Sequence, residues 1–324
     1  MTAYIMRRVG QALLTLLVMS ALVFSGVYLI GNPVDVMISA TATPQERLEI
    51  ISRMGLDQPV WMQYGTFLKN ALVGDLGNSF LYNRPAFDLI AERIPATLEL
   101  AIFALLLAVL LGIPLGIVAG LHPKAASSRG IMALSILGFS LPTFWVGLIM
   151  IMVFSIQLGW LPASGRGETV SVLGLQTSLL TLDGLAHLAL PALNLALFKI
   201  SLVIRLTRAG VTEALHAEYV RFARAKGISE TRIVTVHVLK NILIPLITVL
   251  GLEFGSLIAF AVVTETIFAW PGMGKLIIDA IAILDRPVIL AYLMITVLLF
   301  TMINLVVDIL YSLVDPRVNI EGGT

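Results

Sequence analysis

The stretch EALHAEYVRFARAKGISETRIVTVHVLKNILIP, residues 213–245, is the longest polar interruption in the second half of an otherwise apolar chain. Residues 212–226 are good helix formers, and Gly227 follows them as the left-handed residue that ends many helices. Ser229 stands where the N-cap of a second helix belongs, and that helix continues into apolar sequence after Asn241. We therefore predict a helix, a glycine turn and a second helix on one side of a membrane, in a shape suited to docking.

The composition is that of an integral membrane protein. Of the 324 residues, 58% are hydrophobic and 13% are charged, whereas soluble proteins average about 25% charged residues. The net charge of +1 gives no indication of nucleic-acid binding. The absence of cysteine excludes disulfides, thiolate zinc sites and thiol catalysis, and we expect no resident metal or other cofactor.

Six apolar segments predict membrane-spanning helices. They lie at residues 12–31, 100–121, 131–154, 188–204, 242–263 and 288–307. The fourth is the least regular, because Pro191 and Asn194 interrupt it and Lys199 lies within it. We expect the lysine to extend its stem towards the nearby membrane interface. The fold class predicted is an all-α membrane protein with six spans.

Two segments carry glycines at the spacing that lets helices approach closely. Gly112, Gly116 and Gly120 repeat every four residues in the second span, and Gly251 and Gly255 form a pair in the fifth. For the first stripe we expect packing within the chain in preference to a contact between subunits.

A single carboxylate, Glu253, lies in the fifth span. An ionised carboxylate without a partner is costly inside a membrane, so this side chain should be protonated, paired or facing water. Three interpretations remain open. Glu253 is neutral and hydrogen-bonded within the bundle, or it lines a translocation path, or it couples transport to protons.

Charge sets the expected orientation. The face that carries both chain ends has twelve Lys and Arg in its short loops and tails, whereas the two shorter loops of the other face have three. Because positive charge concentrates on the cytoplasmic side, both termini are predicted to be cytoplasmic.

Several phrases resemble the permease subunits of ABC importers, and specifically the dipeptide, oligopeptide and nickel branch. These phrases are Tyr219-Val220-Arg221 with Lys226-Gly227 and Pro245, Gly74 to Phe80, Pro95 to Leu100, and Asp315-Pro316-Arg317. They occur in the family's order along nearly the whole chain. One departure is Arg221, which stands six residues before Gly227 where the general family pattern has an acidic residue.

The resemblance implies a type I importer permease fold with a long external loop after the first helix. The implied division is residues 1–31 for the head and first span, 32–94 for the external loop, and 95–320 for a five-helix core. That core contains a cytosolic coupling loop at residues 205–241. The implied location is the bacterial inner membrane.

The resemblance also implies partners and site residues. The partners are a second, similar permease in a heterodimer, two ATPase subunits that bind the ATP, and an extracytoplasmic substrate-binding protein. Glu253 and Asn194 are candidates for the translocation path. The substrate stays open among dipeptides, longer peptides, nickel chelates, glutathione and sugars. The residues expected to couple to the ATPase are Glu213, Ala214, Tyr219, Val220, Arg221, Ala223, Arg224, Ala225, Lys226, Gly227 and Ser229.

No catalytic motif is evident, so we do not expect an enzyme. The only candidate for a phosphate-binding loop, at Gly274-Lys275, lacks the first glycine and the final Ser or Thr. The alternative function is a secondary transporter that uses an ion gradient through Glu253. Against that alternative, no internal repeat is visible and six spans are few for such folds.

Overall fold

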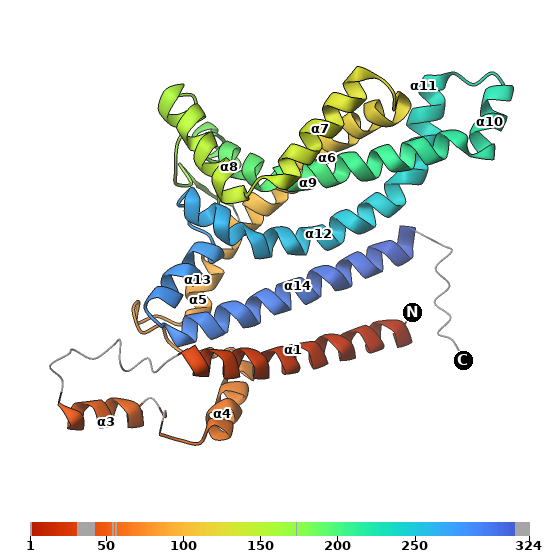
Figure 1. Cartoon of the computed structure of the whole chain (residues 1–324). Coiled ribbons are helices and arrows are strands. Elements are labelled where there is room, and N and C mark those ends of the chain that lie inside the picture. Colours follow the sequence, from red (N-terminus) through yellow and green to blue (C-terminus); the bar gives the residue numbers. More distant parts are fainter. Residues whose placement is uncertain (1, 31–42, 54, 56, 173, 315–324) are drawn as a thin grey trace. The chain divides into compact units, whose positions relative to one another are not determined.

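The computed structural model describes residues 2–30, 43–53, 55, 57–172 and 174–314, which are mainly helical (Figure 1). The described residues form two compact units, one within residues 1–95 and 271–302 and the other within 96–270 and 303–324. The predicted segments 1–31, 32–94 and 95–320 divide the chain by membrane topology, which this grouping by packing does not test. The phrase at Asp315 to Arg317 lies outside the described residues.

The first unit contains the long helix α1 (Thr2–Ile30), most of the long helix α14 (Arg286–Val314), and several short helices. The short helices are α3 (Pro44–Arg53), α4 (Val60–Leu72), α5 (Ala86–Ala91) and α13 (Met273–Ala282). Helix α4 packs on α1, because the ring of Phe24 lies 5.4 Å from Tyr64 and 5.8 Å from Phe67, centre to centre. The hydroxyls of Ser20 and Tyr64 are 2.8 Å apart.

A buried carboxylate organises the phrase Gly74 to Phe80. Asp285 is 1% exposed and accepts a hydrogen bond from the hydroxyl of Ser79 at 2.5 Å. The backbone N–H groups of Phe80 and Leu81 donate to the same carboxylate at 3.2 and 3.4 Å. This phrase therefore wraps around a residue in the turn before α14, and in this unit its role is structural.

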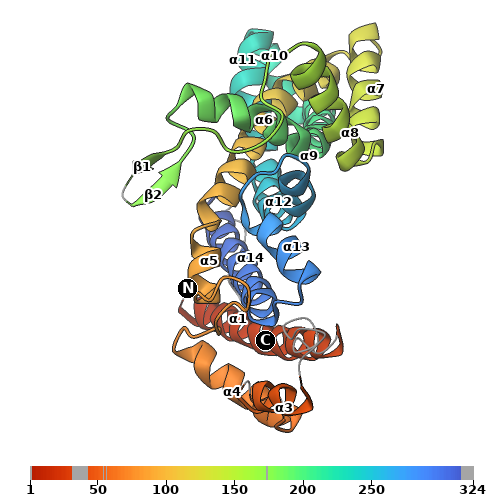
Figure 2. The same ribbon diagram turned by 90° about the vertical axis from the view of Figure 1, so that its left-hand side faces the viewer.

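The second unit contains the predicted docking segment. Its elements are α6 (Ile94–Leu121), α7 (Ala126–Ser140), α8 (Thr143–Met150), η1 (Ile151–Gln157), β1 (Val170–Val172), β2 (Leu175–Thr177), α9 (Leu182–His216), α10 (Glu218–Ala225), α11 (Glu230–Arg232), η2 (Ile233–Val238) and α12 (Leu239–Ile267). The two strands form an antiparallel hairpin that pairs Val170 with Thr177 and Val172 with Leu175 (Figure 2).

Helix α9 is the centre of this unit, and it is longer than predicted. It runs without a break for 35 residues, through Pro191 and Lys199, where the sequence predicted a span of residues 188–204. Proline is tolerated within such helices when neighbouring elements satisfy the freed backbone groups.

The glycine stripe of α6 packs against α9, as predicted. A Cβ atom added at Gly112 would lie 2.6 Å from Val203, and one at Gly120 would lie 2.7 Å from Val211. Figure 1 shows α6 and α9 running alongside each other. Packing within the chain is therefore confirmed. Gly251 of α12 similarly meets Val307 of α14, with 2.5 Å between an added Cβ and the valine methyl.

The third predicted span is bent. Helix α7 and the α8–η1 segment meet at 105°. Leu141 is extended at φ −85° and ψ 137°, because a residue before proline is disfavoured in helical geometry and Pro142 follows. Five described helices are long and apolar enough to cross a membrane, and this pair makes six if it counts as one span. The predicted fold class holds, although the third span is not straight.

Buried polar contacts hold the loop that carries the hairpin. Glu99 at the start of α6 accepts hydrogen bonds from Arg166 at 2.8 and 3.1 Å. It also accepts bonds from the backbone N–H and the hydroxyl of Ser178 at 3.1 and 2.9 Å. The indole of Trp270 donates to the carbonyl of Ala96 at 2.8 Å. The start of α6 thus binds both the loop before α9 and the segment after α12.

Replacing Gly116 with leucine should destabilise the second unit. The first side-chain carbon would lie 2.5 Å from Cβ of Thr207 and 2.9 Å from the carbonyl oxygen of Ile204, and a backbone carbonyl cannot rotate away. Overpacking costs about 1–3 kcal/mol, so the melting temperature in detergent should fall. Gly130 of α7 is exposed and has no atom within 4 Å of its Cβ position, so Gly130→Leu is the matched control and should melt like wild type. An unchanged melting temperature for Gly116→Leu would contradict the packing.

Candidate functional site

The first helix of the predicted docking segment is divided between two helices in the structure. A single helix was predicted for residues 212–226, but α9 ends at His216 and Ala217 is extended, with ψ 149°, before α10 begins. In one continuous helix, positions 214 and 220 would point about 120° apart around the axis, at 3.6 residues per turn. In the structure the chain breaks at Ala217, and Ala214 and Val220 are buried in the same cluster.

That cluster fixes α10 to the membrane helices. Its members come from α9, α10, η2 and α12, and all are buried. They are Val211, Ala214, Val220, Ala223, Ile233, Val238 and Ile242. Because α10 contributes only eight residues, it could not persist in water by itself, and its order depends on this contact.

Gly227 ends α10 as the sequence predicted. Its φ is +74°, which is the left-handed region. Its N–H donates to the carbonyl of Arg224 at 2.9 Å, and the N–H of Ile228 donates to the carbonyl of Ala223 at 3.2 Å. These two bonds form a Schellman motif, and Ile228 packs against the cluster that contains Ala223. A Cβ at this position would meet no atom within 4 Å, so the requirement for glycine here is conformational.

Ser229 occupies the predicted N-cap position, but its side chain does not cap the helix. Its backbone is extended, as at an N-cap, but its hydroxyl makes no capping hydrogen bond. The second helix begins at Glu230 and continues through η2 into α12, past Asn241, as predicted.

The outward face of α10 is basic and aromatic. Phe222 is 62% exposed, and Arg221, Arg224 and Lys226 are also exposed. Arg224 binds the carboxylate of Glu230 with two hydrogen bonds, at 2.6 and 3.2 Å. This pairing lowers the pKa of Glu230. Because the pKa is lowered, the contact is present at neutral pH and is lost as the pH falls through the lowered value.

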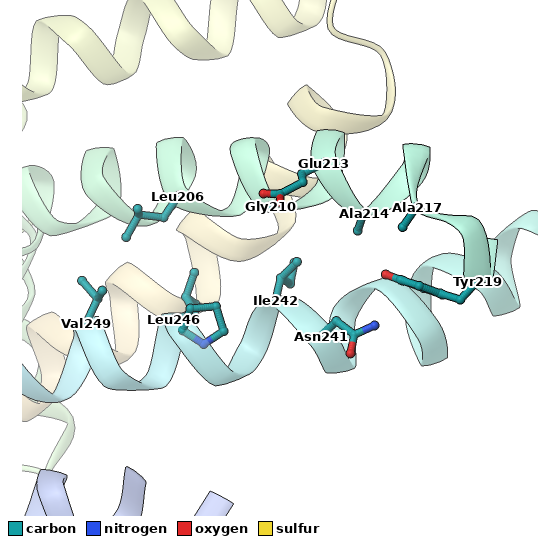
Figure 3. Close-up of a pocket in the computed structure, with 11 residues that line it drawn as sticks. Leu206, Gly210, Glu213, Ala214, Ala217, Tyr219, Asn241, Ile242, Leu246 and Val249 are labelled. Carbon is teal, nitrogen blue, oxygen red and sulfur yellow. The ribbon is translucent and has the colours of Figure 1, made fainter. Parts of the chain in front are cut away.

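A cavity of about 560 Å³ lies between α9, α10 and α12 (Figure 3). Glu213 of α9 and Tyr219 of α10 extend into it, and Ile242, Leu246 and Val249 of α12 form its opposite wall. The predicted coupling residues therefore do not all lie on one surface. Glu213 faces this cavity, whereas the residues from Arg221 to Lys226 include the exposed face of α10.

The carboxylate in α12 has a partner that the sequence did not reveal. Lys199 of α9 binds the carboxylate of Glu253, and it also donates to the hydroxyl of Ser256 at 2.7 Å. The lysine side chain is 8% exposed and that of Glu253 is 28% exposed. Our expectation that Lys199 extends to the membrane interface is therefore wrong, because a carboxylate on the adjacent helix binds the amine. The sequence signal that could have predicted this pair was the presence of one lone charge of each sign in two consecutive spans.

Asn194, the other candidate for a translocation path, is buried in this conformation. It is 1% exposed, and its side-chain amide donates to the hydroxyl of Thr264 at 3.2 Å. Its carbonyl oxygen Oδ1 has no hydrogen-bond partner. The structure gives Asn194 and Glu253 different partners, so the two do not form one cluster. No group of three or more His, Asp or Glu among the described residues could hold a metal ion.

Comparison with known proteins identifies the family. Residues 112–320 match the model of the binding-protein-dependent transport system inner membrane component, and residues 1–101 match the N-terminal model of such membrane components. The chain belongs to this family of permeases. It is therefore a multi-pass inner-membrane subunit of an ATP-driven importer.

Similar permeases align over nearly their whole length. The chain is 40% identical to the di/tripeptide transport system permease protein DppB of Pseudomonas aeruginosa, over 98% of this chain and 99% of that protein. It is 38% identical to the dipeptide permease DppB of Alkalihalophilus pseudofirmus and 34% identical to that of Escherichia coli, with the same coverage.

A solved structure shares the fold. The MetNI methionine ABC transporter in inward-facing conformations aligns with a TM-score of 0.55 and 17% identity, over 70% of this chain and 96% of that chain. The family resemblance and the predicted fold class are thus confirmed. None of these similarities supports a transporter driven by an ion gradient through Glu253.

Single replacements in the Lys199–Glu253 pair should be more harmful than the double replacement. Lys199→Met or Glu253→Gln leaves one charge without its partner, whereas the two together remove both charges. We expect each single variant to lose about 1–3 kcal/mol of stability, less than for a fully buried pair because Glu253 is partly exposed. The double variant should be close to wild type. Thermal unfolding of the four proteins in detergent gives the coupling energy, and additive effects would contradict the pairing.

Proposed function

We propose that this permease imports di- and tripeptides. The observation that carries the proposal is the end-to-end identity of 34–40% with permeases that are named for dipeptide or di/tripeptide transport. The permease would form half of a translocation path, and a second, similar permease would form the other half as a heterodimer. An extracytoplasmic binding protein would deliver the peptide, and two ATPase subunits would bind and hydrolyse ATP. The permease itself would need no cofactor and would catalyse no reaction.

Helix α10 is the proposed contact with an ATPase subunit. The exposed Arg221, Phe222 and Arg224 supply a basic and aromatic surface, and the buried Val220 and Ala223 attach that surface to α9 and α12. Tyr219 would act from the cavity beside α10. A displacement of α10 would then pass to both membrane helices, because the connecting residues are close-packed. Ala225, Lys226 and Gly227 would set the length of the docking helix, and Ser229 would start the return to α12. Glu213 and Ala214 would contribute to the same coupling from the last turn of α9.

The proposed orientation places both termini in the cytoplasm. The exposed basic residues of α10 and its flanks lie at one end of the second unit, and the positive-inside rule assigns that end to the cytoplasm. The hairpin β1–β2 would then face outside and be available to the binding protein. Glu253 would face the translocation path. Asn194 would contribute to the path from its buried position within the helix bundle.

Cysteine labelling should report opposite sides for the hairpin and for the docking loop. Thr169 and Ser229 are both exposed, and the chain has no cysteine of its own. We expect Thr169→Cys to react with a membrane-impermeant maleimide in intact spheroplasts, and Ser229→Cys to react only after permeabilisation. Reaction of both from the same side would reject this orientation.

Reconstituted transport tests the function and the role of α10 together. The wild-type permease, with its partner permease, ATPases and binding protein in proteoliposomes, should take up a labelled dipeptide only when ATP is present. Gly227→Val should lower uptake and binding-protein-stimulated ATP hydrolysis about fivefold or more, because a bulky residue at positive φ costs roughly 1 kcal/mol or more and disturbs the end of the docking helix.

The matched control is Gly227→Asn, since asparagine tolerates the left-handed conformation and a Cβ meets no atom there. It should retain most of the activity. Equal activity of the valine and asparagine variants would reject the coupling role, whereas absence of dipeptide uptake by the wild type would reject the proposed substrate.

A further inference from the structure

The Lys199–Glu253 pair calls for an explanation beyond stability. Removing two charges from water is costly, and a buried ion pair is on balance no more stabilising than well-packed apolar residues. Ionisable residues within membrane spans usually mark a path for a solute or ion. In the described part of the second unit, this pair is the ion pair that joins α9 to α12 within the spans.

The pair lies on the helical faces that lead into the cavity. Lys199 is two turns from Leu206 on α9, and Glu253 is one turn from Val249 on α12, so each shares a face with a residue that lines the cavity. Leu206 and Val249 lie at the end of the cavity away from Tyr219 (Figure 3). The seam between α9 and α12 thus carries the charged pair at one level and the cavity at a level nearer α10. A volume of about 560 Å³ is within the range of small-ligand sites.

We propose that the Lys199–Glu253 pair binds the charged ends of a zwitterionic peptide by exchange of partners. This inference rests on the proposed peptide substrate. The bond between the lysine amine and the glutamate carboxylate breaks, the peptide's ammonium group binds Glu253, and the peptide's carboxylate binds Lys199. No proton moves and the net charge of the site stays the same. One ion pair becomes two, so no charge is left alone in the membrane.

Ser256 can keep both charges in place during the exchange. Its hydroxyl accepts a hydrogen bond from Lys199 at 2.7 Å and lies 2.9 Å from the carboxylate of Glu253. A solute with only one charged end would satisfy one member of the pair and leave the other unpaired. The site therefore selects for solutes that carry an ammonium group and a carboxylate together.

Equilibrium binding to the assembled transporter, without binding protein or nucleotide, tests the exchange. The probes are tritiated alanyl-alanine, its C-terminal amide and its N-acetyl derivative. The wild-type complex should bind the free dipeptide about tenfold or more tightly than either blocked form, because each block removes one charge-assisted hydrogen bond. The double variant Lys199→Met with Glu253→Gln should lose this discrimination. Ser135→Ala, which removes a different buried hydrogen bond to α9, should keep it.

A charge-swapped variant, Lys199→Glu with Glu253→Lys, guards against failure of the neutral variant to assemble. It restores a pair of the same composition, so it should discriminate among the three probes as the wild type does. Equal affinity of the wild type for all three probes, or unchanged discrimination in the neutral double variant, would overturn the inference. If the wild type takes up peptide in the transport assay but gives either of these two binding results, the exchange of partners is wrong and the peptide substrate stands. Absence of uptake by the wild type would overturn the peptide assignment and the exchange with it.

Discussion

The close approach of α6 to α9 is the constraint on which the second unit depends. Gly112, Gly116 and Gly120 remove side chains along one stripe of α6, and the backbone of α9 comes near enough that a single added carbon would collide. Between helices in a membrane there is little hydrophobic driving force, so contacts of this kind supply much of the association. With one face of α9 occupied by α6, the other faces can hold α7 and α12, and the seam with α12 carries the charged pair and the cavity.

The position of the docking segment also depends on the central helix, α9. Helix α9 ends at His216, where Ala217 turns the chain so that α10 lies back against α9, η2 and α12. The eight residues of α10 therefore present a basic, aromatic surface on a support that the membrane bundle makes rigid. A force applied to α10 would reach α9 and α12 on both sides of their shared seam. The Lys199–Glu253 pair joins the same two helices, so the proposed docking helix and the proposed peptide site share α9 and α12 as their support.

Local signals predicted the features that local chemistry determines. Gly227 was recognisable because a glycine after a run of helix formers indicates a left-handed stop, and the spacing of Gly112, Gly116 and Gly120 predicted a close helix contact. Features that depend on tertiary contacts were missed. Alanine is the strongest helix former, so nothing local predicts a break at Ala217. The partner of Lys199 lies 54 residues away, so the pair can be predicted only when the packing of the two spans against each other is known. The bend at Pro142 was visible as a proline, but its size depends on how α8 packs against α9 and α12.

The contact between Ser79 and Asp285 has a consequence for how the chain is made. The two residues are separated by 206 positions, and the carboxylate is the acceptor for three donors around the turn at residues 79–81. A ribosome supplies the chain from its N-terminus, so the segment near Ser79 is synthesised long before its acceptor exists. Its hydrogen bonds must be met by water or by a chaperone while four further spans are inserted. The turn at residues 79–81 is thus among the last parts of the first unit to complete its hydrogen bonds, because its acceptor does not exist until residue 285 has been synthesised.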